Sequence, residues 1–253
     1  MTVSFTPLLG LRSAVLAIAV IGAAGLGGCA TGPNANPNDP LEPLNRSIYG
    51  FNTTVDKAVL KPVATAYQDA VPGVVRLGVT HFFSNLGEIW SFVNNAMQLK
   101  GADAAESVVR FGTNTVFGVF GLFDVASDLG IASHKQDFGQ TLAHWGVPPG
   151  PYLMLPVLGP SSLRDGSALV LDYKGNLLDR EKNIPVRNSL TAVGFVNTRA
   201  NLLPAGDLLD SASLDEYAFL RDAYLQRRDP ELFNTMDTER YDEEVQVPPE
   251  NKE

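Results

Sequence analysis

The sequence predicts a mainly α-helical protein that forms one domain of amphipathic helices. Apolar side chains recur at helical spacing in several separate stretches of the chain. No pair of alternating strands joined by a hairpin turn stands out, and no internal repeat is visible. The 253 residues are enough to bury one sizeable core. We therefore expect a single helical body.

The first predicted helix follows a segment rich in proline and asparagine. Asp39 has the position of its N-cap, and Pro40 that of its first residue, where a missing N–H costs nothing. Pro43 is tolerated in the first turn. Apolar residues then recur at helical spacing, namely Leu41, Leu44, Ile48, Phe51, Val55 and Val59. The pattern predicts a helix of about five turns that ends near Lys61 and Pro62.

The second predicted helix covers residues 81–99 and has two distinct faces. The apolar face carries Phe82, Leu86, Ile89, Val93 and Met97. The polar face carries Ser84, Glu88, Ser91, Asn95 and Gln98. Gly101 is expected to end this helix. Asp103 and Glu106 then have the spacing of a capping box, which predicts the start of the next helix.

The stretch VFGVFGLF, residues 116–123, has no polar side chain and is far too short to span a membrane. Two interpretations stay open at this stage. The stretch is either a buried turn in the core or a re-entrant or interfacial hairpin.

A second broken apolar stretch, VPPGPYLMLPVLGPSSLRDG, covers residues 147–166. Its prolines lack the N–H that a central strand needs, so we expect a stiff apolar connector. Ser162 is expected to end this connector as the N-cap of a helix.

Three more helical patterns complete the body. Residues 162–178 and 188–203 have helical periodicity. Ser213 and Glu216 have capping-box spacing, which predicts a last helix that ends near Arg228, before Pro230.

The first 28 residues have the pattern of a signal peptide. The apolar segment from Ala14 to Leu26 is too short to span a bilayer but has the length of a signal-peptide core. The following LGGCA, residues 26–30, resembles the lipobox of bacterial lipoproteins, where the signal is cleaved before the cysteine. We expect residues 1–28 to be removed and Cys29 to carry diacylglycerol and a fatty acyl group such as palmitate. Ala30, where an aspartate would retain the protein in the inner membrane, favours the outer membrane.

The remaining chain divides into three expected parts. Residues 29–38 form a tether after the lipidated cysteine, and residues 39–232 form the helical domain. Residues 233–253 form an acidic tail that we expect to be disordered.

Composition argues against several function classes. The net charge of −9 makes nucleic acid an unsuitable partner. A single cysteine permits no internal disulfide and no multi-cysteine metal site. The three histidines, His81, His134 and His144, are not at metal-ligand spacing, so we expect no metal and no cofactor.

One group of residues has the side-chain types of a hydrolase active site. Ser161 or Ser162, Asp165 and His144 could serve as nucleophile, acid and base, but no GxSxG motif is present. Ser162 followed by LRDG is better explained as a helix cap. The sequence therefore predicts no enzymatic activity.

Three blocks together resemble the MlaA/VacJ family of outer-membrane lipoproteins. The first is NDPLEPLNRSIYGFN, residues 38–52, and the second is FGQTLAHWGVPPGPYLMLPVLGPSSLRD, residues 138–165. The third consists of TRANLLP, residues 198–204, and DEYAFLRDAYLQRRD, residues 215–229. Their order behind a lipobox makes the resemblance specific over nearly the whole mature body.

The resemblance implies a fold and a function. It implies a ring of amphipathic helices in the inner leaflet of the outer membrane, around a channel that admits phospholipid. The implied work is to remove mislocalised phospholipid from the outer leaflet and pass it to a periplasmic carrier of the MlaC type, which maintains lipid asymmetry. Trimeric porins are the other implied partners.

We expect two apolar segments to lie along the lipid path. The residues concerned are Phe117, Phe120, Phe123, Tyr152, Leu153, Met154 and Leu155. An alternative function is that of a structural envelope lipoprotein that bridges outer-membrane partners. A second alternative is a lipid hydrolase built on the serines and His144.

Overall fold

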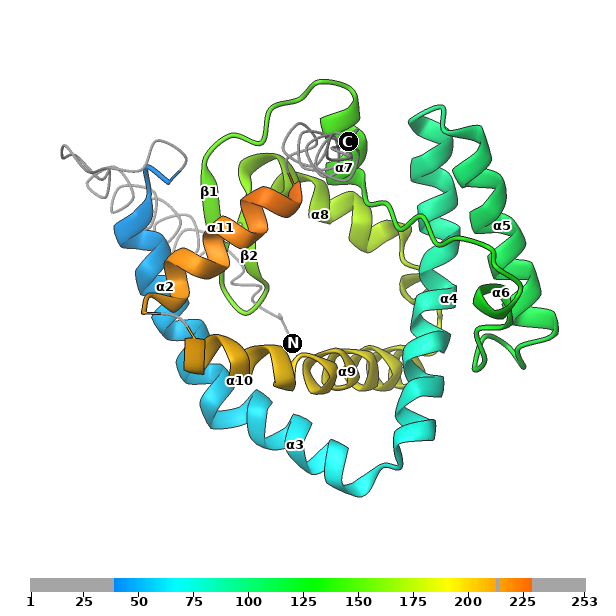
Figure 1. Ribbon diagram of the computed structural model, residues 1–253, viewed down its shortest axis with the longest axis horizontal. Coiled ribbons are helices and arrows are strands. Elements are labelled where there is room, and N and C mark those ends of the chain that lie inside the picture. The colour runs from blue at the N-terminus through cyan, green and yellow to red at the C-terminus, as the bar shows by residue number, and fades with distance from the viewer. Residues whose placement is uncertain (1–38, 213, 229–253) are drawn as a thin grey trace, which may run out of the picture.

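The computed structural model describes residues 39–212 and 214–228, whose helices are arranged in a ring (Figure 1). The predicted signal peptide, Cys29, the tether, Ser213 and the acidic tail lie outside these residues. The helices are α2 (Glu42–Val55), η1 (Asp56–Leu60), α3 (Lys61–Ala70), α4 (Gly73–Met97), α5 (Gly101–Val116), α6 (Val125–Asp128), α7 (Phe138–His144), α8 (Leu163–Gly175), η2 (Leu177–Arg180), α9 (Ile184–Asn201), α10 (Leu203–Ala212) and α11 (Glu216–Arg228). The predicted mainly helical, single-domain architecture is confirmed.

One side of the ring is a long helical arc made of α2, η1 and α3 (Figure 1). The helix predicted to end near Lys61 instead continues to Ala70. The π-helical turn η1 carries the backbone from α2 into α3, so Pro62 falls within the first two residues of α3. A proline is tolerated there, and π-turns adjust a helix around such a site.

Asp39 does not cap α2, contrary to the sequence prediction. The N-cap is Leu41, which has no side-chain hydrogen bond to the helix. The Asp39 carboxylate is fully buried and accepts hydrogen bonds from Asn45 Nδ2, at 2.8 Å, and from the hydroxyl of Tyr217 in α11. It therefore connects the two ends of the described chain.

The opposite side of the ring is the antiparallel pair α4 and α5 (Figure 1). The predicted helix 81–99 begins earlier, at Gly73, and ends at Met97. Leu99 has φ = 59° and reverses the chain, so Gly101 begins α5 rather than ending α4. The predicted capping box is not formed, because the N-cap of α5 is Lys100 and has no side-chain bond.

The two faces predicted for the 81–99 helix are present in α4, with the polar face inward. Its buried residues are all polar, namely Asn85, Glu88, Ser91, Asn94 and Asn95. Phe82, Leu86, Ile89 and Val93 are only partly buried. The hydrogen-bonding side chains of α4 therefore face the protein, and its apolar side chains lie nearer the surface.

The proline-rich stretch contains a β-hairpin, which the sequence did not predict. β1 (Tyr152–Leu155) pairs antiparallel with β2 (Gly159–Ser162), with Tyr152 opposite Ser162 and Leu155 opposite Gly159. A two-stranded sheet has only edge strands, so Pro160 needs no second ladder partner for its missing N–H. Val157, at φ = 66°, and Gly159, at φ = 86°, form the reversal.

The C-terminal helices largely agree with the predicted patterns. Ser162 caps α8 as expected, and its hydroxyl accepts a hydrogen bond from Asp165 N at 3.1 Å. The pattern over 162–178 corresponds to α8 and the start of η2, and α9 begins before the pattern over 188–203. The predicted last helix is α11, which ends at Arg228.

The described body has a small apolar core and a large apolar surface. One core cluster consists of Tyr152, Met154, Tyr217 and Tyr224, and a second of Ala64, Ala200 and Leu203. Many more large apolar side chains are exposed than buried. Among the described helices, none is both long enough and apolar enough to cross a bilayer. Such a surface is typical of a protein that contacts membrane or other apolar partners.

Candidate functional site

Two cavities lie between the helices of the ring. The first, here called the polar cavity, has a volume of about 540 Å³ and is bounded by α4, the segment 135–140, Asp172 to Leu178 and the end of α11. The second, the apolar cavity, has a volume of about 570 Å³ and is bounded by α2, η1, the hairpin tip, α9, α10 and α11. Both volumes fall within the range of small-molecule sites.

The hairpin tip, residues 156–158, forms one wall of the apolar cavity and is held by α2. Asn52 Nδ2 donates to Leu155 O at 2.9 Å, and Asn52 Oδ1 accepts from Val157 N at 2.7 Å. Asn45, two turns earlier, contacts β1 in the same way: it donates to Tyr152 O and accepts from Met154 N. The two carboxamides thus satisfy the open edge of β1, as a third strand would.

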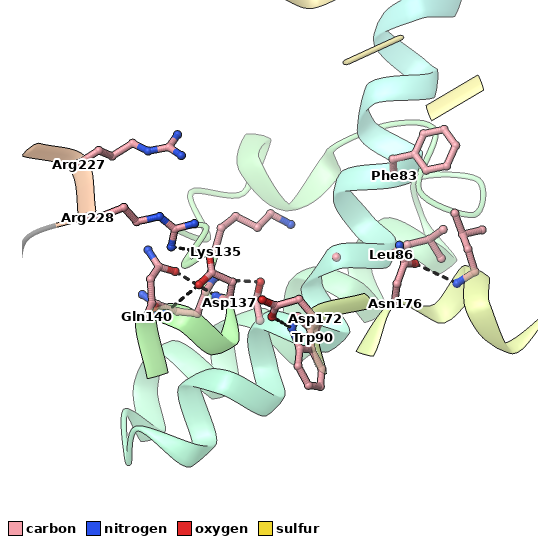
Figure 2. Close-up of a pocket in the computed structure, with 14 residues that line it drawn as sticks. Phe83, Leu86, Trp90, Lys135, Asp137, Gln140, Asp172, Asn176, Arg227 and Arg228 are labelled. Atoms are coloured by element: carbon pink, nitrogen blue, oxygen red, sulfur yellow. Dashed lines mark hydrogen bonds and ion pairs between the residues drawn. The ribbon is translucent and has the colours of Figure 1, made fainter. Parts of the chain in front are cut away.

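The polar cavity has a cationic end and an apolar end. Figure 2 shows Arg227 and Arg228 extending from the end of α11, with Lys135 beside them. Phe83 and Leu86, on α4, lie on the other side of the cavity. Trp90 and Asp172 lie between these two ends.

Most charges of the polar cavity are paired. Lys135 Nζ lies 2.8 Å from Glu88 Oε1, and Arg228 Nη1 lies 2.6 Å from Asp137 Oδ2. Burial lowers the pKa of Lys135, although Glu88 opposes this effect. The pKa of Arg228 is raised because Asp137 and Asp165 outweigh the desolvation of its guanidinium.

Asp172 is held by two hydrogen bonds at one oxygen. Its Oδ1 accepts from Trp90 Nε1 and from Phe138 N, each at 2.7 Å. Burial raises the pKa of Asp172 above its ordinary value, and these two bonds only partly offset that effect.

A buried ion network supports the α4 wall. Arg110, of which only 3% is exposed, pairs with Glu88 Oε1 at 3.1 Å and with Asp124 Oδ1 at 3.0 Å. Because Glu88 also binds Lys135, the network connects α5 with the polar cavity. A buried charge is costly unless it is paired, and Glu88 is paired through Oε1 with both Arg110 and Lys135.

The predicted lipid-path residues separate into an exposed group and a buried group. Phe117 is 73% exposed, Phe120 75% and Phe123 57%, in the turn between α5 and α6. This turn, residues 117–123, is therefore not a buried core turn; the interfacial interpretation is the one that its exposure favours. Figure 1 places this end of α5 on the outside of the ring.

The predicted lipid-path residues of β1 are buried or partly buried. Tyr152 is fully buried, and its ring packs edge-on against Tyr217 and Tyr224. Leu153 and Leu155 are partly exposed. Met154 is nearly buried but lines the apolar cavity.

The residues considered for catalysis have structural partners. The Ser162 hydroxyl accepts the capping bond from Asp165 N. The Asp165 carboxylate accepts from Tyr224 Oη at 2.6 Å and pairs with Arg164 and Arg228. The exposed His144 ends α7.

The other two histidines also have contacts at the protein surface. His81 Nδ1 lies 3.3 Å from Leu122 O, and His134 Nε2 lies 2.7 Å from Glu106 Oε2. The described residues contain no group of three or more side chains arranged to hold a metal ion.

Sequence reasoning missed the asparagines that hold the hairpin. Asn45 and Asn52 lie seven residues apart on α2, within the apolar stripe that predicted this helix. Two amides on an otherwise apolar face indicate backbone partners elsewhere in the fold, because buried polar groups need hydrogen bonds. The seven-residue spacing, which places both asparagines on one face of the helix, was the signal in the sequence that could have identified them.

Comparison with known proteins gives consistent results. A family profile described as MlaA lipoprotein matches residues 37–231. An uncharacterized protein of Rickettsia bellii is 38% identical over 192 residues, which cover 76% of this chain and 75% of the relative. The intermembrane phospholipid transport system lipoprotein MlaA of Escherichia coli K12 is 36% identical over 228 residues, which cover 87% of this chain and 88% of the relative.

A solved structure confirms the likeness of the folds. It is described as "Structural basis for maintenance of bacterial outer membrane lipid asymmetry" and superposes with a TM-score of 0.65 at 38% identity. The match covers 75% of this chain and 96% of that one.

Proposed function

The chain belongs to the MlaA lipoprotein family, and on that premise we propose that it works in intermembrane phospholipid transport. The protein takes mislocalised phospholipid from the outer leaflet of the outer membrane and passes it to a periplasmic carrier. This transfer maintains the lipid asymmetry of that membrane. It needs no bond to be broken in the lipid, so the proposal includes no enzymatic step.

One observation carries this proposal: the described body buries more polar and charged residues than apolar ones and exposes many large apolar side chains. Asn85, Glu88, Asn94 and Arg110 are almost fully buried, whereas Phe117 and many other large apolar side chains are exposed. Apolar surface of this extent is unfavourable in water and favourable against acyl chains. A ring with this polarity suits the boundary between a leaflet and the periplasm.

The proposed lipid path includes the turn 117–123 and part of strand β1. We place the exposed turn with Phe117, Phe120 and Phe123 against acyl chains, as an interfacial hairpin. Met154 lines the apolar cavity, while Leu153 and Leu155 lie on the other face of β1. We leave Tyr152 out of the path, because its ring has no exposed surface.

Anchoring and partners complete the proposal. Cys29 carries the lipid anchor, and more than one acyl chain gives stable membrane attachment. The protein then faces the periplasm, where a carrier of the MlaC type receives the phospholipid. Trimeric porins are its partners in the membrane. The alternative of a bridging lipoprotein has no observation in the fold that favours it.

Labelling of exposed lipid tests the function. Cells of the source bacterium that lack this protein should show more phosphatidylethanolamine at the surface when intact cells are treated with an impermeant amine reagent. Expression of the wild-type chain should restore low labelling. Equal labelling with and without the protein would contradict a role in asymmetry. A Ser161→Ala, Ser162→Ala and His144→Ala triple variant that restores low labelling would remove the hydrolase alternative.

A fractionation experiment tests the anchor. The Cys29→Ser variant should remain an unprocessed precursor and should be lost from the outer-membrane fraction. Normal processing and normal fractionation of this variant would show that Cys29 is not the anchor.

A further inference from the structure

The polar cavity has one cation and one carboxylate left after its ion pairs are counted. Lys135 pairs with Glu88, and Arg228 pairs with Asp137. Within residues 39–212 and 214–228, the Arg227 side chain makes no hydrogen bond or ion pair. Asp172 has no cationic partner within 4.0 Å in the same range, and both of its hydrogen bonds end on Oδ1. Arg227 and the Oδ2 atom of Asp172 are thus available to a ligand.

We propose that the polar cavity is a headgroup subsite for a zwitterionic phospholipid with a primary ammonium group, such as phosphatidylethanolamine. Arg227 binds the phosphate, and Asp172 accepts hydrogen bonds from the ammonium. The inference rests on the proposed function and adds a headgroup preference to it.

The charge arrangement carries the electrostatic part of this inference. A phosphodiester is best bound by a guanidinium, which presents several N–H donors in a fixed fork. A primary ammonium has three N–H donors that suit a carboxylate. A quaternary ammonium has none, and a glycerol headgroup has no cation to offer. The cavity therefore favours ethanolamine over choline and over glycerol.

The burial of Asp172 gives independent support. Its carboxylate is desolvated and its pKa is raised, with the nearby Asp137 adding to the effect. A desolvated carboxylate is unfavourable unless a cation or donors compensate it. The donors Trp90 Nε1 and Phe138 N compensate it in part at Oδ1, and the ammonium of the ligand supplies the rest at Oδ2.

The apolar end of the cavity accommodates the part of the lipid next to the headgroup. Phe83 and Leu86 lie across the cavity from the arginines (Figure 2). A volume of about 540 Å³ suits a headgroup, a glycerol and the first acyl carbons. The acyl chains then continue outside the cavity, along apolar surface of the ring.

The test is a competition measured by native mass spectrometry on the full lipidated protein in mild detergent. Equimolar phosphatidylethanolamine, phosphatidylglycerol and phosphatidylcholine are added, and the bound lipids are counted. We expect the wild type to hold phosphatidylethanolamine at about fivefold excess over each of the other two, as one extra charge-assisted contact predicts. Equal occupancy by the three lipids would overturn the proposal.

Two variants separate the roles of the charged residues. Arg227→Gln should reduce the binding of all three lipids by about tenfold, because the phosphate is common to them. Asp172→Asn should abolish the ethanolamine preference and leave phosphatidylglycerol binding unchanged. Asn retains an Oδ1 acceptor for Trp90 and Phe138, so the fold should persist.

A control variant and a phosphate competition accompany the lipid-binding measurements. Arg180→Gln removes an exposed arginine outside both cavities and should bind lipids as the wild type does. If Asp172→Asn melts at a much lower temperature, the surface variant Arg227→Gln decides alone, and unchanged binding by it refutes the subsite. Inorganic phosphate at the same concentration should not displace the lipid; displacement would mean a free-phosphate site instead.

Failure of this inference is distinguishable from failure of the transport function. Lipid bound without headgroup preference, together with low surface labelling in cells, leaves transport intact and rejects the subsite. Loss of transport is instead shown when the wild-type protein binds no phospholipid and does not lower surface labelling.

Discussion

At the scale of single residues, two asparagine side chains make the hydrogen bonds to the hairpin backbone that a neighbouring strand makes in a larger sheet. Asn45 is buried and makes three hydrogen bonds, to Asp39, Tyr152 O and Met154 N. Asn52 repeats the contact at the hairpin tip. A two-stranded hairpin alone is marginally stable, so these bonds and the tyrosine packing fix its position.

We expect Asn45→Ala to lower the free energy of unfolding by about 3 kcal/mol, because it leaves the Tyr152 carbonyl, the Met154 amide and the Asp39 carboxylate short of partners. Urea unfolding followed by circular dichroism measures the change. The exposed Asn188→Ala, in α9, is the control and should shift stability by less than about 0.5 kcal/mol. Equal effects of the two substitutions would contradict the role of Asn45.

Asp124 is a residue whose charge state should affect stability in acid. Burial raises its pKa, but hydrogen bonds from Ser127 and Asn114, together with Arg110, outweigh that effect and lower it from 3.8 to about 2. The folded state therefore binds its proton less readily than the unfolded chain does.

The sign of the pH dependence follows from this lowered pKa. Asp124 stabilises the fold fully above pH 4, and the contribution is lost as the pH falls toward 2. It amounts to about 2 kcal/mol at most, since the side chain is 24% exposed. Melting temperatures between pH 6 and 2.5 should fall less steeply for Asp124→Asn than for the wild type. Asp128→Asn, in the helix that Asp124 caps, controls for the loss of a carboxylate; parallel curves for wild type and Asp124→Asn would refute the assignment.

At the scale of elements, the turn 117–123 depends on two glycines. A Cβ on Gly118 would lie 2.2 Å from Phe123 O and 2.5 Å from Asn114 O, both of them backbone atoms. Gly121 has φ = 87°, and its Cβ would lie 2.6 Å from Asn85 Nδ2. The glycines allow the apolar turn to pack closely against α4 and α5 while its phenylalanines stay outside.

We expect Gly118→Ala to destabilise the protein by about 3 kcal/mol, because the backbone of the turn must move. Gly112→Ala is the matched control within α5: no atom lies within 4 Å of the new Cβ, so it should stabilise by about 0.5–1 kcal/mol. Thermal unfolding followed by circular dichroism compares them. A neutral Gly118→Ala would show that the close approach is not required.

Sequence periodicity predicted several of the helices but not α3, α6, α7 or the hairpin. α4 and α11 were found because their apolar residues recur every three or four positions. β1 and β2 were missed because prolines argue against strands in a large sheet, and nothing local reveals that the sheet has only two strands. Asp39 was misassigned for a similar reason, since its partner Tyr217 is distant in sequence.

At the scale of the whole molecule, the ring is closed by contacts between its first and last elements. Tyr217, in α11, donates to Asp39, and Tyr49 donates to Glu216 at 2.6 Å. Arg46 binds Asp215 through Nη1 and Nη2. The Arg46 contact lowers the pKa of Asp215 to about 2. The residues of each pair are more than 160 positions apart in sequence, so local sequence patterns cannot reveal the closure of the ring.

The candidate site was predictable only in part for the same reason. The apolar turn stood out in the sequence because of its composition, and its exposure makes it an interfacial candidate. The polar cavity was not recognisable in the sequence, because Lys135, Asp172 and Arg227 come from three segments that are far apart in the chain. Only the ring brings them together.

The exposed apolar surface of the ring leads to a prediction for membrane binding without the lipid anchor. We expect a chain that begins at Thr31 to float with phospholipid vesicles on a density gradient, because its apolar surface is exposed. Phe117→Ser with Phe120→Ser should reduce vesicle binding by at least about tenfold, since each ring contributes about 1.5–3 kcal/mol when it leaves water.

Leucine at the same two positions distinguishes apolar burial from a specific fit. Phe117→Leu with Phe120→Leu keeps apolar side chains on the turn and should retain most of the vesicle binding. Circular dichroism should give the same helical content for all three proteins, so that a binding defect is not an unfolding defect. If the serine variant floats as well as the wild type, the turn 117–123 is not the part of the ring that enters the leaflet, and the insertion must be assigned to another apolar face.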